Sequence, residues 1–279
     1  VDDNSKDNTE EVVTSFINKY KNIKYLKNNK NFGAGVSRNI GYEYSSGEYV
    51  TFIDSEDWAD LATYETAVDF LDENPDCEIA IWGIKNEFTN QSSSFIRTDY
   101  KVCNIINKEL ALSLLCNTYS LDITISSYLG SKIFRSTFLK LNNIYFDDIL
   151  FEDVVFSFKS ILYAQKVVLL PNIYTHYYQR PNSTIHSFTE KHICDMFKAF
   201  AYIRAIIDND FLLYKDNFSS LVEKCCKTLF KIMYDNIEDK EQQKKMLCCF
   251  FEHLLGFCSI ENILEYLDPD RTKKLLLNF

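Results

Sequence analysis

The first 85 residues alternate between strand-like and helix-like segments, and this order limits the fold more than any other feature of the chain. Apolar residues spaced by three and four behind capping residues indicate helices, whereas short runs of β-branched and aromatic residues indicate strands. Such alternation predicts a layered α/β fold, a mostly parallel sheet flanked by helices. The expected strands are residues 1–3, 23–26, 49–53 and 77–84, and the expected helices are residues 7–20, 34–44 and 61–71.

The sequence opens at the carboxyl end of an expected strand, Val1-Asp2-Asp3. A parallel strand needs a neighbour and a crossover connection, usually a helix. We therefore expect a preceding strand and helix, roughly 30 residues, upstream of this sequence.

Beyond residue 107 the alternation loosens, and from about residue 188 the sequence is helical in character to its end. In the middle part we expect helices at residues 108–116 and after Glu152, and strands at 128–134, 167–170 and 173–178. Farther on, Leu221, Cys225, Leu229 and Ile232 align with Val222, Cys226, Phe230 and Met233 in one apolar face. That face could pack within the chain, dock on a protein or lie on a membrane. Because Lys, Glu and Asp are mixed on the polar faces around it, packing within the chain is favoured.

Composition narrows the classes of function. The chain has 279 residues, 46% hydrophobic, with a formal net charge of −10, so a real core is expected and a nucleic-acid partner is not. No run of 18 apolar residues occurs, so we expect no membrane-spanning helix. We expect a cytoplasmic protein that acts in solution or at the inner face of the membrane.

The nine cysteines are odd in number, contain no CxxC and lack the spacing of zinc ligands along the sequence. The sequence therefore favours reduced, buried thiols over a disulfide framework. Of the four histidines, only His186, in a polar loop, is a candidate for a metal or phosphate contact; the others are expected to be structural.

Two segments near the start carry groups suited to a nucleotide. Residues 1–7 read VDDNSKD, and carboxylates at the end of a parallel strand lie where open α/β sheets bind ligands. Residues 31–41 read NFGAGVSRNIG, in which small residues open a helix and Arg38 follows one turn later. Helix-start N–H groups and an Arg suit a phosphate. An acidic helix cap and close helix–sheet packing are the alternative interpretations.

Two further segments are acidic. Residues 54–58 read DSEDW directly after an apolar strand, so Asp54 and Glu56 can turn toward one ion, and such oxygen ligands suit Mg²⁺ or Mn²⁺. Glu152 and Asp153 begin an apolar helix, where a carboxylate could serve as a general base. A solvated acidic turn and helix capping are the alternatives.

In this order and spacing, the four segments resemble the family 2 glycosyltransferases of the GT-A fold. The family pattern runs V-D-D-G-S-x-D, N-x-G-x-x-x-A-R-N-x-G, a DxD-type D-S-D-D and a later E-D, where this chain reads VDDNSKD, NFGAGVSRNIG, DSED and FED. GEYV at 47–50 and YYQRPNST at 177–184 are also similar. The resemblance covers roughly residues 1–187 and implies a Rossmann-like GT-A domain. Its donor-binding half would be residues 1–100, its acceptor-binding half 101–187, with a helical appendage at 188–279.

The resemblance implies inverting transfer of a hexose or N-acetylhexosamine from a nucleotide-diphosphate sugar, expected to be a UDP-sugar. The acceptor would be a hydroxyl of a glycan, a lipid-linked saccharide or a glycoprotein. The implied donor-binding residues are Asp2, Asp3, Asn31, Gly33, Arg38, Asn39 and Asp54. Asp54 and Glu56 would hold Mn²⁺ or Mg²⁺, Asp153 would be the catalytic base and Glu152 its support. Trp58 and Arg180 are candidates for the acceptor site.

Two departures from the family pattern matter. Asn4 stands in place of Gly, which a turn tolerates, and Glu56 stands in place of Asp, which lengthens a metal-binding side chain by one methylene. The second departure motivates an alternative, a catalytically inactive sugar-nucleotide-binding or scaffold paralogue. A nucleotidyltransferase is a third hypothesis, although it would need a Gly-rich basic phosphate loop.

Overall fold

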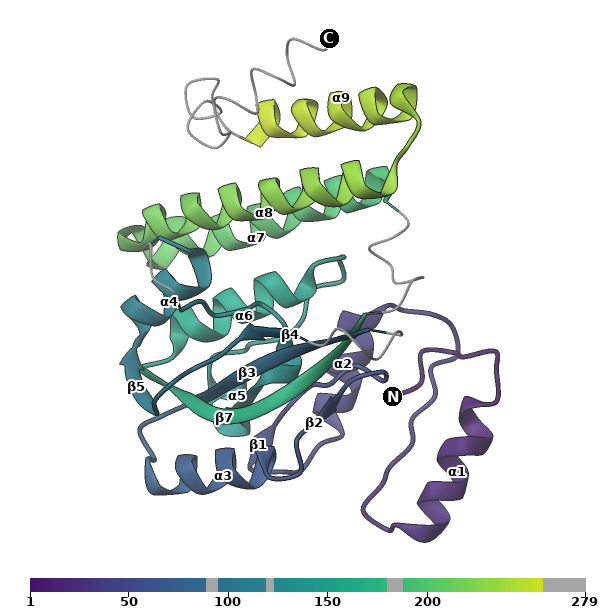
Figure 1. Cartoon of the computed structure of the whole chain (residues 1–279), viewed down its shortest axis with the longest axis vertical. Coiled ribbons are helices and arrows are strands. Elements are labelled where there is room, and N and C mark those ends of the chain that lie inside the picture. Colours follow the sequence, from purple (N-terminus) through teal and green to yellow (C-terminus); the bar gives the residue numbers. More distant parts are fainter. Residues whose placement is uncertain (89–94, 119–122, 180–187, 258–279) are drawn as a thin grey trace.

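Figure 1 shows the computed structural model of the chain, a twisted sheet with helices on both faces and long helices stacked beyond one of them. The structure describes residues 1–88, 95–118, 123–179 and 188–257. The helices are α1 Thr9–Lys19, α2 Ala34–Glu43, α3 Thr63–Glu73, α4 Lys108–Cys116, α5 Ser136–Leu141, α6 Glu152–Tyr163, α7 Glu190–Asp210, α8 Lys215–Asn236 and α9 Lys240–Phe257. The strands are β1 Tyr49–Val50, β2 Trp58–Ala59, β3 Ile79–Phe88, β4 Phe95–Thr98, β5 Asn104–Asn107, β6 Lys132–Arg135 and β7 Lys166–Gln179.

The sheet is mixed. Its order is β1-β6-β3-β7-β2, with β4 also on β3 and β5 also on β7. The long pair β3–β7 is parallel, whereas the other pairs of named strands are antiparallel. The expected α/β layers and C-terminal helices are confirmed, but the sheet is less parallel than we expected, because only β3 and β7 pair in parallel among the named strands. Residues 1–3 and 23–26 were both expected as strands but form no ladder with each other; Asp2 makes an isolated parallel bridge with the neighbouring Lys27.

The two long central strands separate two apolar cores. On β3, Ile79 and Ile81 face the larger core, while Ala80 and Trp82 face the smaller core beneath α3. This is the two-residue period of a strand buried on both faces. Since every side chain of this stretch is at most 1% exposed, β3 forms the rigid base of the sheet.

Strand β7 is continuous where we expected two strands. Pro171 and Asn172 interrupt its pattern, and Asn172 has a φ of 62°. The register on β3 shifts there, from Leu169 opposite Ile81 to Tyr174 opposite Gly83. Because proline cannot donate to the ladder, the strand accommodates it as an irregularity and then resumes pairing.

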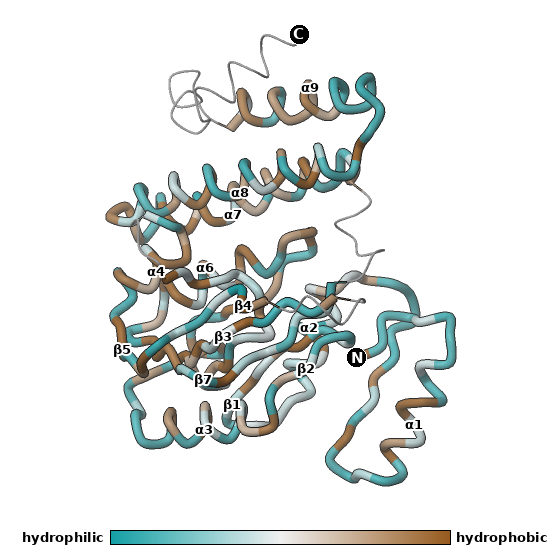
Figure 2. Tube along the Cα trace, viewed as in Figure 1, coloured by the Kyte–Doolittle hydropathy of each residue, from teal (hydrophilic) through white to brown (hydrophobic). Residues whose placement is uncertain are grey.

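The C-terminal helices extend the larger core. Their apolar residues belong to the same buried cluster as those of α4 and α6, and Figure 2 shows their hydrophobic stripes alternating with polar surface. The face predicted on α8 packs within the chain, as its composition favoured. Its fully or largely buried members are Leu221, Val222, Cys225, Cys226, Leu229 and Met233. Within the described ranges, no helix combines the length and apolar character needed to cross a membrane.

Candidate active site

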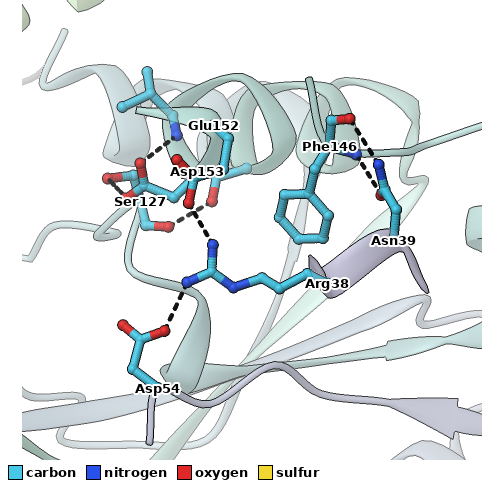
Figure 3. Close-up of polar contacts among 9 residues, drawn as sticks. Arg38, Asn39, Asp54, Ser127, Phe146, Glu152 and Asp153 are labelled. Atoms are coloured by element: carbon cyan, nitrogen blue, oxygen red, sulfur yellow. Dashed lines mark hydrogen bonds and ion pairs between the residues drawn. The ribbon is translucent and has the colours of Figure 1, made fainter. Parts of the chain in front are cut away.

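Arg38 joins two acidic segments that lie far apart in the sequence (Figure 3). Its Nη2 lies 2.6 Å from Asp54 Oδ1, and its Nη1 donates to Glu152 Oε1. Only 18% of the Arg38 side chain is exposed, and 13% of that of Glu152. Three of the four motif segments therefore meet at one place, α2, the turn after residues 49–53 and the start of α6.

Helix α2 is held against the segment that precedes α6. The Asn39 amide nitrogen donates to the Phe146 carbonyl at 2.9 Å, and the Phe146 N–H donates to the Asn39 amide oxygen at 2.9 Å. Gly35 is required here because a Cβ would lie 2.7 Å from the Asp147 carbonyl oxygen. Asn39, expected in the nucleotide pocket, thus fixes the position of α2 and of Arg38.

The first acidic pair organises the loop before α2. Asp3 accepts hydrogen bonds at 2.8 Å from the N–H groups of Phe32 and Gly33 and from the Asn28 amide. Burial acts to raise the pKa of Asp3, but these hydrogen bonds outweigh it and hold the pKa below its ordinary value. Gly33 has a φ of +90°, which favours glycine. The Asp3 carboxylate therefore sets the shape of the loop that we expected to meet the donor.

Asp2 is buried beside this loop. Its carboxylate accepts from the Ser5 N–H at 2.7 Å and from the Tyr25 hydroxyl at 2.5 Å. The hydrogen bonds from Ser5 and Tyr25 lower the pKa of Asp2 to about 2. The Asn31 amide lies 3.5 Å from the Asp3 carbonyl oxygen, so Asp2, Asp3 and Asn31 form one connected loop structure.

The carboxylates of the acidic turn after residues 49–53 have different partners. The Asp54 side chain is 36% exposed and faces Arg38, and Glu56 accepts from the Ser55 hydroxyl at 3.1 Å. Asp57 instead accepts from the Tyr178 N–H at 2.8 Å and from the Tyr128 hydroxyl. Burial raises the pKa of Asp57. Asp54 and Glu56 therefore remain the candidate metal ligands, while Asp57 anchors the turn to β7.

At the start of α6 the two acidic residues differ in their partners. Asp153 Oδ2 accepts from the Ser127 hydroxyl at 3.2 Å, and Oδ1 accepts from the Val154 N–H at 2.9 Å. Glu152 binds Arg38, and burial followed by the nearby charge of Asp153 raises the pKa of Glu152. Figure 3 shows both carboxylates on the side of α6 that faces Arg38. Ser127 was not anticipated from the sequence.

Lys132 on β6 is a second residue that the sequence analysis missed. Its side chain is fully buried, and its Nζ donates to the carbonyl oxygens of Ser126 and Tyr128 at 2.6 Å each. Burial lowers the pKa of Lys132 to about 7. Because Ser127 contacts Asp153 and Tyr128 contacts Asp57, Lys132 holds the loop that links the two acidic segments. A lysine within the apolar stretch of β6 was the available signal.

The acceptor candidates are placed only in part. Trp58 on β2 is 46% exposed and stacks on His176, with ring centroids 4.9 Å apart. His176 lies between Glu87 Oε1 at 2.7 Å and Asp60 Oδ1 at 3.1 Å. Trp58 thus offers an exposed aromatic face, while Arg180 and His186 lie outside the described residues.

Comparisons with known proteins indicate the family that this chain resembles. Residues 1–129 match the family model described as Glycosyl transferase family 2. The poly(ribitol-phosphate) beta-N-acetylglucosaminyltransferase TarS of Staphylococcus aureus (strain MW2) is 33% identical over 175 residues, 61% of this chain and 28% of that protein. The cholesterol galactosyltransferase of Borreliella burgdorferi is 27% identical over 196 residues, 69% of this chain and 54% of that protein.

The fold also agrees with the expected GT-A type. A crystal structure of S. aureus TarS 1-349 in complex with UDP-GlcNAc matches with a TM-score of 0.70 and 21% identity, covering 92% of this chain and 71% of that one. The chain spans less than a third of full-length TarS and about half of the galactosyltransferase. Residues 1–129, a little under half of the chain, are thus similar to glycosyl transferase family 2 in sequence and in the order of their motifs.

Proposed function

We propose that this chain transfers a hexose or N-acetylhexosamine from a nucleotide-diphosphate sugar to an acceptor hydroxyl with inversion of configuration. One observation carries the proposal. Through Arg38, the structure joins Asp54 of the expected metal segment to Glu152 of the expected base segment. Glycosyl transfer needs the donor diphosphate and the acceptor nucleophile side by side, so the metal segment and the base segment must lie close together.

A UDP-sugar is the donor that the comparisons support best. The relative TarS is named for N-acetylglucosamine transfer and has been solved with UDP-GlcNAc, and the second relative is named a galactosyltransferase. In this chain, the loop ordered by Asp3 leads into α2, whose first turns bear Arg38. Helix-start N–H groups and a guanidinium suit an anionic donor on a chain of net charge −10. The acceptor is a glycan, a lipid-linked saccharide or a glycoprotein.

The metal-ligating oxygen atoms of the site fit Mg²⁺ or Mn²⁺. Asp54 and Glu56 offer hard carboxylate oxygens, and such ions are held by one or two carboxylates together with substrate phosphates. In the part of the chain that the structure describes, these two are not grouped with a third His, Cys or carboxylate ligand. When bound, the ion would act as a Lewis acid that neutralises charge on the diphosphate.

Asp153 is the proposed general base. The Ser127 hydroxyl and the Val154 N–H hold its carboxylate in place, which keeps it ready to accept a proton from the acceptor hydroxyl. The hydroxyl oxygen then forms a bond to the anomeric carbon as the bond to the diphosphate oxygen breaks, through an oxocarbenium-like transition state. Glu152 keeps Arg38 turned toward this site. A single displacement of this kind inverts the anomeric configuration.

The test is release of UDP from UDP-GlcNAc and from UDP-galactose with Mn²⁺ and candidate acceptors. We expect Asp153→Asn to lower kcat by about 10²–10⁴-fold, the usual contribution of a positioned base. Asp148→Asn, which changes an exposed aspartate nearby, is the matched control and should leave kcat unchanged. Equal turnover of both variants would reject Asp153 as the base.

A second candidate is a non-catalytic sugar-nucleotide-binding paralogue, because Glu56 replaces the usual Asp and Asp54 is already paired with Arg38. Thermal unfolding with UDP-sugars separates the two hypotheses, since a ligand of the native state raises the Tm. A rise in Tm without any UDP release favours the paralogue. Release of pyrophosphate instead of UDP would indicate a nucleotidyltransferase.

A further inference from the structure

Three metal-binding side chains meet in the helical region at the C-terminal end of the described chain. Cys194 comes from α7, and Cys249 and His253 come from successive turns of α9. Their ligand atoms all lie within 4.8 Å of one another, and Cys249 Sγ is 3.8 Å from His253 Nδ1. All three side chains are of intermediate burial. This cluster is separate in sequence and in chemistry from the acidic site of the GT-A domain.

The packing of α7 on α9 holds these groups in register. One turn before the cluster, Glu190 Oε1 of α7 lies 2.7 Å from Lys245 Nζ of α9. On the other side of Cys194, the ring of Phe197 contacts those of Phe250 and of the ligand His253, with centroids 5.5 and 5.6 Å apart. The two helices therefore run in the same direction, and the ion pair and the aromatic contacts hold them together at the three ligands.

The distances suit a tetrahedral ion. Zinc binds thiolate at about 2.3 Å and imidazole at about 2.0–2.1 Å, so a tetrahedral site places its donor atoms about 3.5–3.8 Å apart. Donor atoms that lie up to 4.8 Å apart need to approach by at most about 1.3 Å to reach that geometry. His253 Nδ1 also lies 2.9 Å from the Cys249 carbonyl oxygen. This carbonyl belongs to the hydrogen-bond ladder of α9, so it keeps a partner if the ring turns to a metal.

We propose that Cys194, Cys249 and His253 bind a Zn²⁺ ion that joins α7 to α9, with water at the fourth position. Two thiolates and an imidazole favour zinc over Mg²⁺ or Mn²⁺, which prefer oxygen ligands such as those of Asp54 and Glu56. The chain would thus bind two kinds of metal at two places. Because α9 contributes Phe250 and Leu254 to the core, zinc binding stabilises the docking of this helix.

The experiment is titration of the reduced, metal-free chain with Co²⁺ and then Zn²⁺ in excess Mg²⁺. Thiolate-to-cobalt charge-transfer absorption reports cysteine ligation and ignores ions held by carboxylates. We expect one Co²⁺ per chain with this absorption, displaced by Zn²⁺, and a higher Tm with Zn²⁺. Cys194→Ser and Cys249→Ser should lose the absorption, and His253→Gln should bind Zn²⁺ at least about 100-fold more weakly.

Cys248→Ser is the matched control because Cys248 neighbours the cluster on α9 but is exposed. It should bind like the wild type, and circular dichroism checks that every variant folds. Three results would overturn the proposal: no charge-transfer absorption in the wild type, absorption that persists in Cys194→Ser, or absorption lost in Cys248→Ser.

Discussion

The acidic site around Arg38 and the C-terminal helices both bring distant residues together, but by different forces. In the acidic site, Arg38 is held between Asp54 and Glu152, and Asn39 binds the main chain of Phe146. The C-terminal helices instead meet through aromatic and aliphatic side chains that extend the main core. Polar contacts fix the orientation of side chains, which a reaction needs, whereas the burial of apolar side chains supplies most of the stability of the fold. Changes in the two regions should therefore have different consequences for activity and for unfolding.

The largest expected effect on stability comes from the helical region. Phe250→Ala removes a ring that is 2% exposed and contacts Phe197 and Phe230. We expect a loss of about 3–5 kcal/mol in the free energy of unfolding, the usual range for a buried phenylalanine. The measurement is urea unfolding followed by circular dichroism. Turnover per folded molecule should not change.

Leu255→Ala is the control, because Leu255 lies on the same helix and is 53% exposed. Its effect should stay within about 0.5 kcal/mol. If Phe250→Ala were as mild as the control, α9 would not be part of the core, and the contrast between the two regions would weaken.

A smaller loss of stability, joined to a loss of activity, is expected in the acidic site. Arg38→Met removes the partner of two carboxylates, one of them largely buried. Breaking a buried ion pair leaves an uncompensated charge and costs about 3 kcal/mol. Unlike Phe250→Ala, this change should also lower kcat/KM in the UDP-release assay.

Arg38→Lys tests whether the charge of Arg38 or the shape of its guanidinium matters. A lysine keeps the charge but lacks the planar fork that reaches Asp54 and Glu152 together. We expect stability to recover in part while kcat/KM stays low. Full activity in Arg38→Lys would show that only the charge matters and that the bridge has no part in positioning.

The sequence predicted the local elements well where capping and periodicity agree. Asn107 caps α4, its side chain accepting from the Leu110 N–H at 3.0 Å, and this helix has the expected bounds. The sequence was wrong about a strand at residues 23–26, which form no ladder, although the neighbouring Lys27 makes an isolated bridge with Asp2. It also missed β2, because a strand of two residues has no period to detect.

The candidate site, too, could be predicted from the sequence only in part. The order of the acidic motifs correctly predicted which segments approach one another, since motifs at strand ends and helix starts meet at one edge of a sheet. Ser127 and Lys132 were missed because their contacts depend on tertiary packing that no local pattern reports. The cluster of Cys194, Cys249 and His253 was invisible for the same reason, because its ligands come from two helices and have no spacing rule along the chain.

The last prediction concerns the pH dependence of stability and rests on Lys132. Burial lowers the pKa of Lys132 to about 7, from an ordinary value of 10.5. Between these values the unfolded chain binds a proton that the folded chain does not. Stability should therefore rise with pH above 7, by at most about 1.4 kcal/mol per pH unit from this group.

Lys132→Met should abolish that contribution, and Lys140→Met, which changes an exposed lysine, should retain it. The measurement is urea unfolding at intervals from pH 7 to pH 9.5. The variants should diverge steadily with pH, because only a group whose protonation differs between the folded and unfolded states makes stability depend on pH. Parallel curves would mean that the carbonyl oxygens of Ser126 and Tyr128 keep the buried ammonium charged, so that Lys132 holds the loop between the acidic segments as a cation.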